Sequence, residues 1–159
     1  MYLNLASTEI CNRTIQIERG TTGLITSPNW PFNKYPPSSS CIYNITSTGS
    51  VKIAFETFRS EFHSSCVWVY INLCVSTSLW HVITLHFFSR HDYVIVYDGP
   101  TMKAPILGRY CGSKLPPALK SSSQHLLIYF HTDSSVNDDG FSIRYFSGKF
   151  IFSFQIHFS

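Results

Sequence analysis

Short apolar segments separated by turn residues recur along the chain, and several of them alternate between apolar and polar positions. The alternation is clearest over 50–55, and apolar runs rich in β-branched and aromatic residues occupy 93–97 and 125–130. A two-residue period places one face of a strand in a core. β-Branched and aromatic side chains pack well on the pleated surface of a sheet. The pattern predicts an all-β fold, a sandwich or a barrel, with strands near 23–25, 41–45, 50–55, 93–97, 125–130 and 140–146.

Composition narrows the class of protein. The 159 residues are enough for one domain with a real core. Hydrophobic residues make up 44% and charged residues 13%, a balance that excludes a disordered chain. The net charge of +3 is small and the basic residues are scattered, so no nucleic acid partner is expected.

The cysteines and two glycosylation sequons indicate the secretory pathway. None of the five cysteines forms a C-x-x-C pair, which disfavours zinc and thioredoxin-like sites. Asn12 and Asn44 each begin an N-x-S/T sequon close to a cysteine. We therefore expect a disulfide-bonded glycoprotein, either secreted or the ectodomain of a membrane protein. No signal peptide is visible in the first residues, which suggests a fragment or an incomplete gene model.

Two stretches depart from the strand pattern. Residues 67–89 contain no charged residue, and they include Cys74. The stretch is long enough for a membrane helix, but polar residues are spread through its length, so no membrane insertion is expected. Residues 147–159 form a Phe-rich tail. With residues 1–10, this tail is expected to lie outside the domain.

Four motifs follow one another along the chain. They are Gly23-Leu24-Ile25-Thr26-Ser27-Pro28-Asn29-Trp30-Pro31 with Tyr35-Pro36, Asp92-Tyr93-Val94-Ile95-Val96-Tyr97-Asp98-Gly99, Leu107-Gly108-Arg109-Tyr110-Cys111-Gly112, and Phe130-His131-Thr132-Asp133-Ser134-Ser135 with Gly140-Phe141. In this order and spacing the motifs resemble the CUB domain, an extracellular module of complement and tolloid-like proteases, cubilin-like receptors and spermadhesins. The resemblance implies a single two-sheet, jelly-roll-like β-sandwich over 11–146, within a larger multidomain protein. It also implies disulfides Cys11–Cys41 and Cys66–Cys111, which leave Cys74 unpaired.

The spacing between Glu61 and Asp92 departs from the family pattern. The offset is 31 residues, and it falls to 8 if the 23 residues of 67–89 are removed, which resembles the family spacing. Our hypothesis is that 67–89 is a retained intron or a gene-model error. The alternative is a genuine long surface loop, which costs only modest entropy.

The resemblance further implies a calcium site at one end of the sandwich. The implied ligands are Glu61, Asp92, Asp133, Ser135 through an oxygen and Val136 through its backbone carbonyl, with Tyr35 orienting Glu61. Calcium prefers six to eight oxygen ligands, and an extracellular module of this kind is expected to bind it with a Kd of about 10⁻⁴ to 10⁻³ M. Without the resemblance, the same acids would be ordinary turn residues.

In calcium-binding CUB domains a partner's Lys or Arg reaches these acids, so Glu61, Asp92 and Asp133 are also the expected partner-binding residues for an extracellular protein ligand. Two alternatives remain open. One is a calcium-free structural CUB domain in a larger receptor or protease. The other is a lectin-like module in which Trp30, Phe32 and Tyr35 stack on sugars.

The sequence does not indicate an enzyme. None of the seven histidines lies in an H-E-x-x-H motif or a comparable metal spacing. No G-x-S-x-G nucleophile motif occurs. The chain is therefore predicted to be a recognition module.

Overall fold

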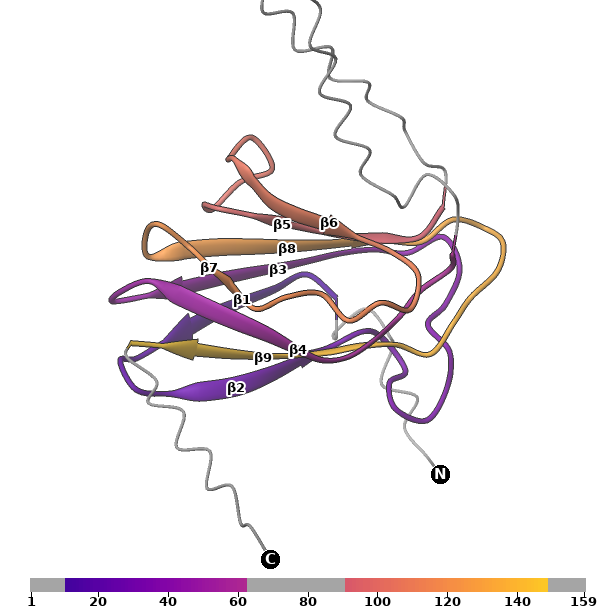
Figure 1. Cartoon of the computed structure of the whole chain (residues 1–159), viewed down its shortest axis with the longest axis horizontal. Coiled ribbons are helices and arrows are strands. Elements are labelled where there is room, and N and C mark those ends of the chain that lie inside the picture. Colours follow the sequence, from indigo (N-terminus) through magenta and orange to yellow (C-terminus); the bar gives the residue numbers. More distant parts are fainter. Residues whose placement is uncertain (1–10, 63–90, 149–159) are drawn as a thin grey trace, which may run out of the picture.

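The protein is all β over the residues that the computed structural model describes, 11–62 and 91–148 (Figure 1). Its strands are β1 (Arg13–Ile17), β2 (Thr22–Thr26), β3 (Ser40–Ser47), β4 (Val51–Arg59), β5 (Tyr93–Tyr97), β6 (Ile106–Tyr110), β7 (Leu119–Lys120), β8 (His125–His131) and β9 (Gly140–Ser147). The predicted fold class is confirmed. The segment 67–89, with Cys74, and the ends 1–10 and 149–159 lie outside the described residues.

The strands form two packed sheets, as expected for a jelly-roll-like sandwich. One sheet has the order β1-β3-β8-β5-β6 and the other has the order β2-β9-β4-β7. The β1–β3 pair is parallel, and the other strand pairs are antiparallel. The six predicted strands correspond to β2, β3, β4, β5, β8 and β9. The pattern missed β1, β6 and the two-residue β7.

The core lies between the sheets and is built by alternation. In β3, Cys41, Tyr43 and Ile45 are fully buried, whereas the residues between them are partly exposed. The Phe130 ring of β8 packs edge-on against Tyr35 and against Phe141, with ring centroids 5.1 Å apart in each pair. These edge-to-face contacts add to the hydrophobic gain of burying the rings.

The first predicted disulfide, Cys11–Cys41, is present and ties the start of the described chain to β3. Cys111 is disulfide-bonded as well. Because Cys66 lies outside the described residues, the pairing of Cys66 with Cys111 stays a prediction.

Strand register brings the ends of β4 and β8 and the start of β5 to one end of the sandwich. Tyr93, the first residue of β5, pairs with His131, the last residue of β8. Arg59, at the end of β4, pairs with Gly140, at the start of β9. The segments that follow β4 and β8 and the one that precedes β5 therefore meet at the same end (Figure 1). This end carries the acidic side chains of Glu61, Asp92 and Asp133.

Candidate metal centre

Each of the three predicted acidic ligands stands just outside a strand at this end. Glu61 lies two residues beyond β4, Asp92 directly precedes β5, and Asp133 lies two residues beyond β8. The register that aligns β5 with β8 therefore places Asp92 beside Asp133, although 41 residues separate them. The sheet brings together acids that are distant along the chain.

Asp92 is the buried base of the site. Its side chain is fully buried, and both of its oxygens accept hydrogen bonds. The Tyr35 hydroxyl donates to Oδ2 at 2.5 Å, and the Asp133 backbone N–H donates to Oδ1 at 2.8 Å. Burial raises the pKa of Asp92 above its ordinary value, and these two hydrogen bonds oppose the increase. Nearby Asp133 and Glu61 raise the pKa of Asp92 further by like-charge repulsion.

Tyr35 joins Asp92 to the chain after β4. Its hydroxyl, besides donating to Asp92, accepts a hydrogen bond from the backbone N–H of Glu61 at 3.2 Å. Burial and the hydrogen bond to Asp92 raise the pKa of Tyr35. We expected Tyr35 to orient Glu61. In the structure the Tyr35 hydroxyl bonds the Asp92 carboxylate and the backbone N–H of Glu61, so its role toward the Glu61 side chain stays a prediction.

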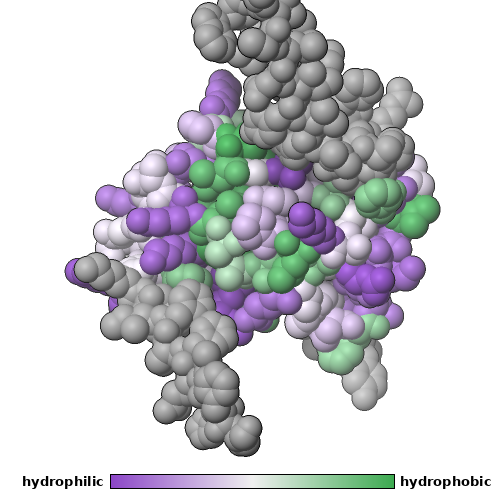
Figure 2. All heavy atoms as spheres, in the orientation of Figure 1, coloured by the Kyte–Doolittle hydropathy of each residue, from purple (hydrophilic) through white to green (hydrophobic). Residues whose placement is uncertain are grey.

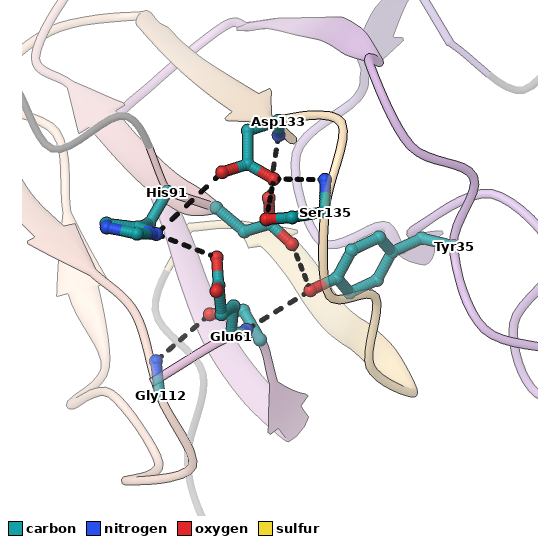
Figure 3. Close-up of polar contacts among 8 residues, drawn as sticks. Tyr35, Glu61, His91, Gly112, Asp133 and Ser135 are labelled. Atoms are coloured by element: carbon teal, nitrogen blue, oxygen red, sulfur yellow. Dashed lines mark hydrogen bonds and ion pairs between the residues drawn. The ribbon is translucent and has the colours of Figure 1, made fainter. Parts of the chain in front are cut away.

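Glu61, His91 and Asp133 form the outer layer of the site, and Figure 3 shows their side chains pointing toward one another. Nδ1 of His91 lies 3.1 Å from Oε2 of Glu61 and 3.7 Å from Oδ2 of Asp133. One ligand atom from each residue lies within 4.8 Å of the others. The side chains are 13–27% exposed, so the cluster is accessible without being fully solvated.

The loop after β8 fixes the Asp133 carboxylate. Oδ1 of Asp133 accepts hydrogen bonds from the Ser135 hydroxyl at 2.6 Å and from the Ser135 backbone N–H at 2.7 Å. The bonds from Ser135 lower the pKa of Asp133, since they favour its ionised form. The Val136 side chain is exposed and supplies no donor atom, so only its carbonyl can serve as a ligand.

Two residues of this end were missed by sequence reasoning. His91 was grouped with histidines of no assigned role, and its position directly before Asp92 was the available signal. Asn137 lies in the same loop as Asp133, and its Oδ1 is buried without a hydrogen-bond donor among the described residues. A buried, unpaired amide oxygen is costly unless something binds it.

The donor set fits calcium. Three carboxylates and the Ser135 hydroxyl are hard oxygen donors supplied by three separate segments. Each oxygen of Asp92 accepts one hydrogen bond and keeps a second lone pair. Nδ1 of His91 faces Glu61 and Asp133, and a divalent ion would offset the negative charge of the converging carboxylates.

Comparison with known proteins identifies the family of this chain. The CUB domain profile matches residues 11–87 and 81–145, which together make up most of the chain. This protein belongs to the CUB domain family. The CUB domain is a non-catalytic module of extracellular proteins, and the match covers most of the 11–146 range expected for the domain.

The CUB relatives are longer proteins. The chain is 36% identical to human tolloid-like protein 1 over 122 residues, which is 76% of this chain and 10% of that protein. The human MASP-1/3 CUB1-EGF-CUB2 structure matches with a TM-score of 0.63 and 29% identity, over 87% of this chain and 42% of the other. The MASP-1 CUB2 domain bound to Ca²⁺ matches with a TM-score of 0.58 and 26% identity, over 86% and 100% of the two chains.

The structure also shows the surroundings of the two predicted glycosylation sites and of the aromatic residues proposed to bind sugars. Asn12 is exposed, whereas the Asn44 amide nitrogen donates to the Pro100 carbonyl at 3.4 Å and its Oδ1 is buried. Glycosylation of both stays a prediction. Of the aromatics proposed to stack on sugars, Phe32 is exposed but Tyr35 is buried against Phe130, which removes Tyr35 from a sugar-binding surface. The described residues include no helix able to span a membrane.

Proposed function

We propose that this CUB domain binds calcium through Glu61, Asp92, Asp133, Ser135 and the Val136 carbonyl, and that the calcium-organised acids bind a Lys or Arg of an extracellular protein partner. The observation that carries the proposal is the convergence of Glu61 and Asp133 on the buried carboxylate of Asp92. Calcium bound in the MASP-1 CUB2 structure supports it by similarity. The parent protein would be a secreted or membrane-anchored multidomain glycoprotein.

The hydrogen bonds around the acids support both calcium binding and the binding of a partner's Lys or Arg. Tyr35 holds Asp92, and Ser135 holds Asp133, so two of the three carboxylates are oriented before any ion arrives. Pre-organised ligands lower the entropy cost of binding. Calcium would lock the remaining carboxylate, Glu61, and leave partly exposed oxygens of Glu61 and Asp133 to accept hydrogen bonds from a partner's cation. Oδ1 of Asn137 is a candidate for an additional oxygen ligand.

Replacing Asp133 by Ala is expected to abolish calcium-dependent stabilisation. At 10 mM calcium the unaltered chain should gain about 1–3 kcal/mol of unfolding free energy, given a Kd of about 10⁻⁴ to 10⁻³ M. Thermal unfolding in calcium and in chelator measures the difference. Asp139→Ala is the matched control, because Asp139 lies in the same loop but pairs with Arg59 at 3.3 Å. An equal melting temperature of the unaltered chain in calcium and in chelator would show that the domain does not bind calcium in this range.

The partner step is tested with a lysine-bearing surface. The chain should bind immobilised poly-L-lysine more tightly in calcium than in chelator, and Asp133→Ala should remove that calcium dependence. Asp139→Ala should retain it. Surface plasmon resonance provides the measurement. If poly-L-lysine binding is the same in calcium and in chelator, the partner is recognised elsewhere, even where calcium itself binds.

Replacing His91 by Ala is expected to strengthen calcium binding by a few-fold. Nδ1 of His91 contacts the same two carboxylates that a calcium ion would use, so the ion must displace it. A single polar contact of this kind contributes up to about 1 kcal/mol, so its loss changes an equilibrium by up to about fivefold. Calcium titration of the two proteins at one pH provides the comparison. Weaker calcium binding by His91→Ala would show that His91 supports the ion instead of competing with it.

A further inference from the structure

A basic depression of about 400 Å³ lies at the opposite end of the sandwich from the acidic cluster. It is formed where β9 ends and where β4 begins, and Figure 2 shows hydrophilic residues gathered over this end. Its lining residues include three cations, Arg19, Lys52 and Lys120, and three residues that carry hydroxyl groups, Thr48, Ser50 and Ser147. The hydroxyl of Ser147 is buried and bonded to that of Ser47, so Thr48 and Ser50 supply the available hydroxyls. Two glycines complete the lining, and the described residues contribute no carboxylate and no apolar side chain to it.

Two of the cations face each other across neighbouring strands. Lys52 of β4 pairs with Lys120 of β7 in the sheet register. Like charges placed directly opposite one another on adjacent strands are destabilising. Among the described residues, no acid forms an ion pair with Lys52, Lys120 or Arg19. An anion shared by the two lysines would turn this repulsion into attraction.

Arginines elsewhere on the described surface do form ion pairs, in contrast to Lys52, Lys120 and Arg19. Arg144, on the same sheet, is held by Glu56 at 2.5 Å. Arg59, at the far end of β4, is held by Asp139 at 3.3 Å. Arg144 and Arg59 are therefore neutralised by acids, whereas no described acid pairs with the cations of the depression. Nζ of Lys52 lies 6.0 Å from the centroid of the Phe146 ring, a contact that leaves its charge unneutralised.

The walls of the depression are fixed by backbone hydrogen bonds. The Gly20 N–H donates to the Ser147 carbonyl at 3.0 Å, which ties the β1–β2 turn to the end of β9. The Val51 N–H donates to the Ser121 hydroxyl at 2.8 Å, and the Ser121 N–H donates back to the Val51 carbonyl at 2.8 Å. The residues that flank Lys52 and Lys120 are therefore locked together, and a ligand would meet a preformed site.

We propose that this depression binds the sulfate groups of an acidic extracellular polysaccharide. Ammonium, guanidinium and hydroxyl groups all donate to sulfate oxygens, and charge-assisted bonds of this kind are short and strong. A volume of about 400 Å³ admits one or two sugar residues. An anionic membrane is the less favoured partner, since the described residues of the lining offer no apolar side chain to insert among lipids. The site is independent of the calcium centre.

Heparin binding by the whole chain tests the proposal. The double variant Lys52→Gln/Lys120→Gln is expected to bind immobilised heparin about tenfold more weakly and to elute at lower salt, since two cations no longer release counterions. The charge-matched control is Lys34→Gln/Lys114→Gln, two exposed lysines in the β2–β3 and β6–β7 loops, outside the depression. It should remain within about twofold of the unaltered chain.

Three results would overturn the proposal. One is no heparin binding by the unaltered chain at physiological salt. Another is an equal loss in both double variants, which would mean that net charge alone drives binding. The third is tighter binding to phosphatidylserine vesicles that compete with heparin, which would assign the depression to a membrane. Chelator should leave heparin binding unchanged, so a failed calcium site and a failed polysaccharide site give different results.

Discussion

Replacing Asp92 by Ala is expected to lower the unfolding free energy by about 3 kcal/mol, because it leaves buried donors without their acceptor. The Tyr35 hydroxyl and the Asp133 backbone N–H both donate to the Asp92 carboxylate, and Asp92 itself is fully buried. Losing these two hydrogen bonds also loosens the start of the loop that carries Asp133. Urea unfolding in chelator measures the change apart from any effect of calcium.

The isosteric variant Asp92→Asn separates the two roles of this residue. Its amide oxygen can still accept a hydrogen bond from Asp133, so the fold should lose less stability than in Asp92→Ala. The charge is gone, however, and calcium stabilisation should disappear. A stability loss below about 0.5 kcal/mol for Asp92→Ala, which is typical of an uninvolved surface position, would contradict the structure around this residue.

Replacing Phe130 by Ala is expected to cost about 3–5 kcal/mol, the range for truncating a fully buried aromatic ring. Phe130 is completely buried and contacts Tyr35 on one side and Phe141 on the other. The cavity would also free the Tyr35 ring, whose hydroxyl supports Asp92. Calcium binding should therefore weaken together with stability. Chemical unfolding and calcium titration of the same preparation measure both effects.

Phe130→Leu provides the control for Phe130→Ala. Leucine fills more of the ring's volume, so the cost should fall to roughly half of that for alanine. Calcium binding should then change little, since Tyr35 keeps an apolar neighbour. If Phe130→Ala lowers stability but leaves calcium affinity unchanged, the link through Tyr35 between core and site would be disproved.

The strands that the sequence predicted are those whose burial follows a simple period. In β3 and the first part of β4, buried and partly exposed residues alternate, and the apolar runs of β5 and β8 contain the central residues of one sheet. β1 carries Arg13, Thr14 and Gln16 and pairs with only β3 at the sheet edge, so its pattern is mostly polar. β7 has two residues, too few to show a period.

The acids of the site could be predicted only through the family motifs. Glu61, Asp92 and Asp133 are far apart along the chain, and only the register of β5 against β8 shows that Asp92 and Asp133 meet. The contact between His91 and Glu61 depends on the packing of the two sheets, because β5 and β4 belong to different sheets. The opposition of Lys52 and Lys120 depends on the β4–β7 pairing, and β7 was not foreseen. Contacts set by tertiary register leave no periodic signal in the sequence.

Calcium titration of the whole chain by isothermal calorimetry is the decisive measurement for the calcium site. One binding site with a Kd of about 10⁻⁴ to 10⁻³ M is expected. Asp133→Ala should lose this binding, whereas Asp139→Ala should keep it. No binding by the unaltered chain up to 10 mM calcium, or equal binding by Asp133→Ala, would contradict the account and leave a CUB domain whose acidic end has another role.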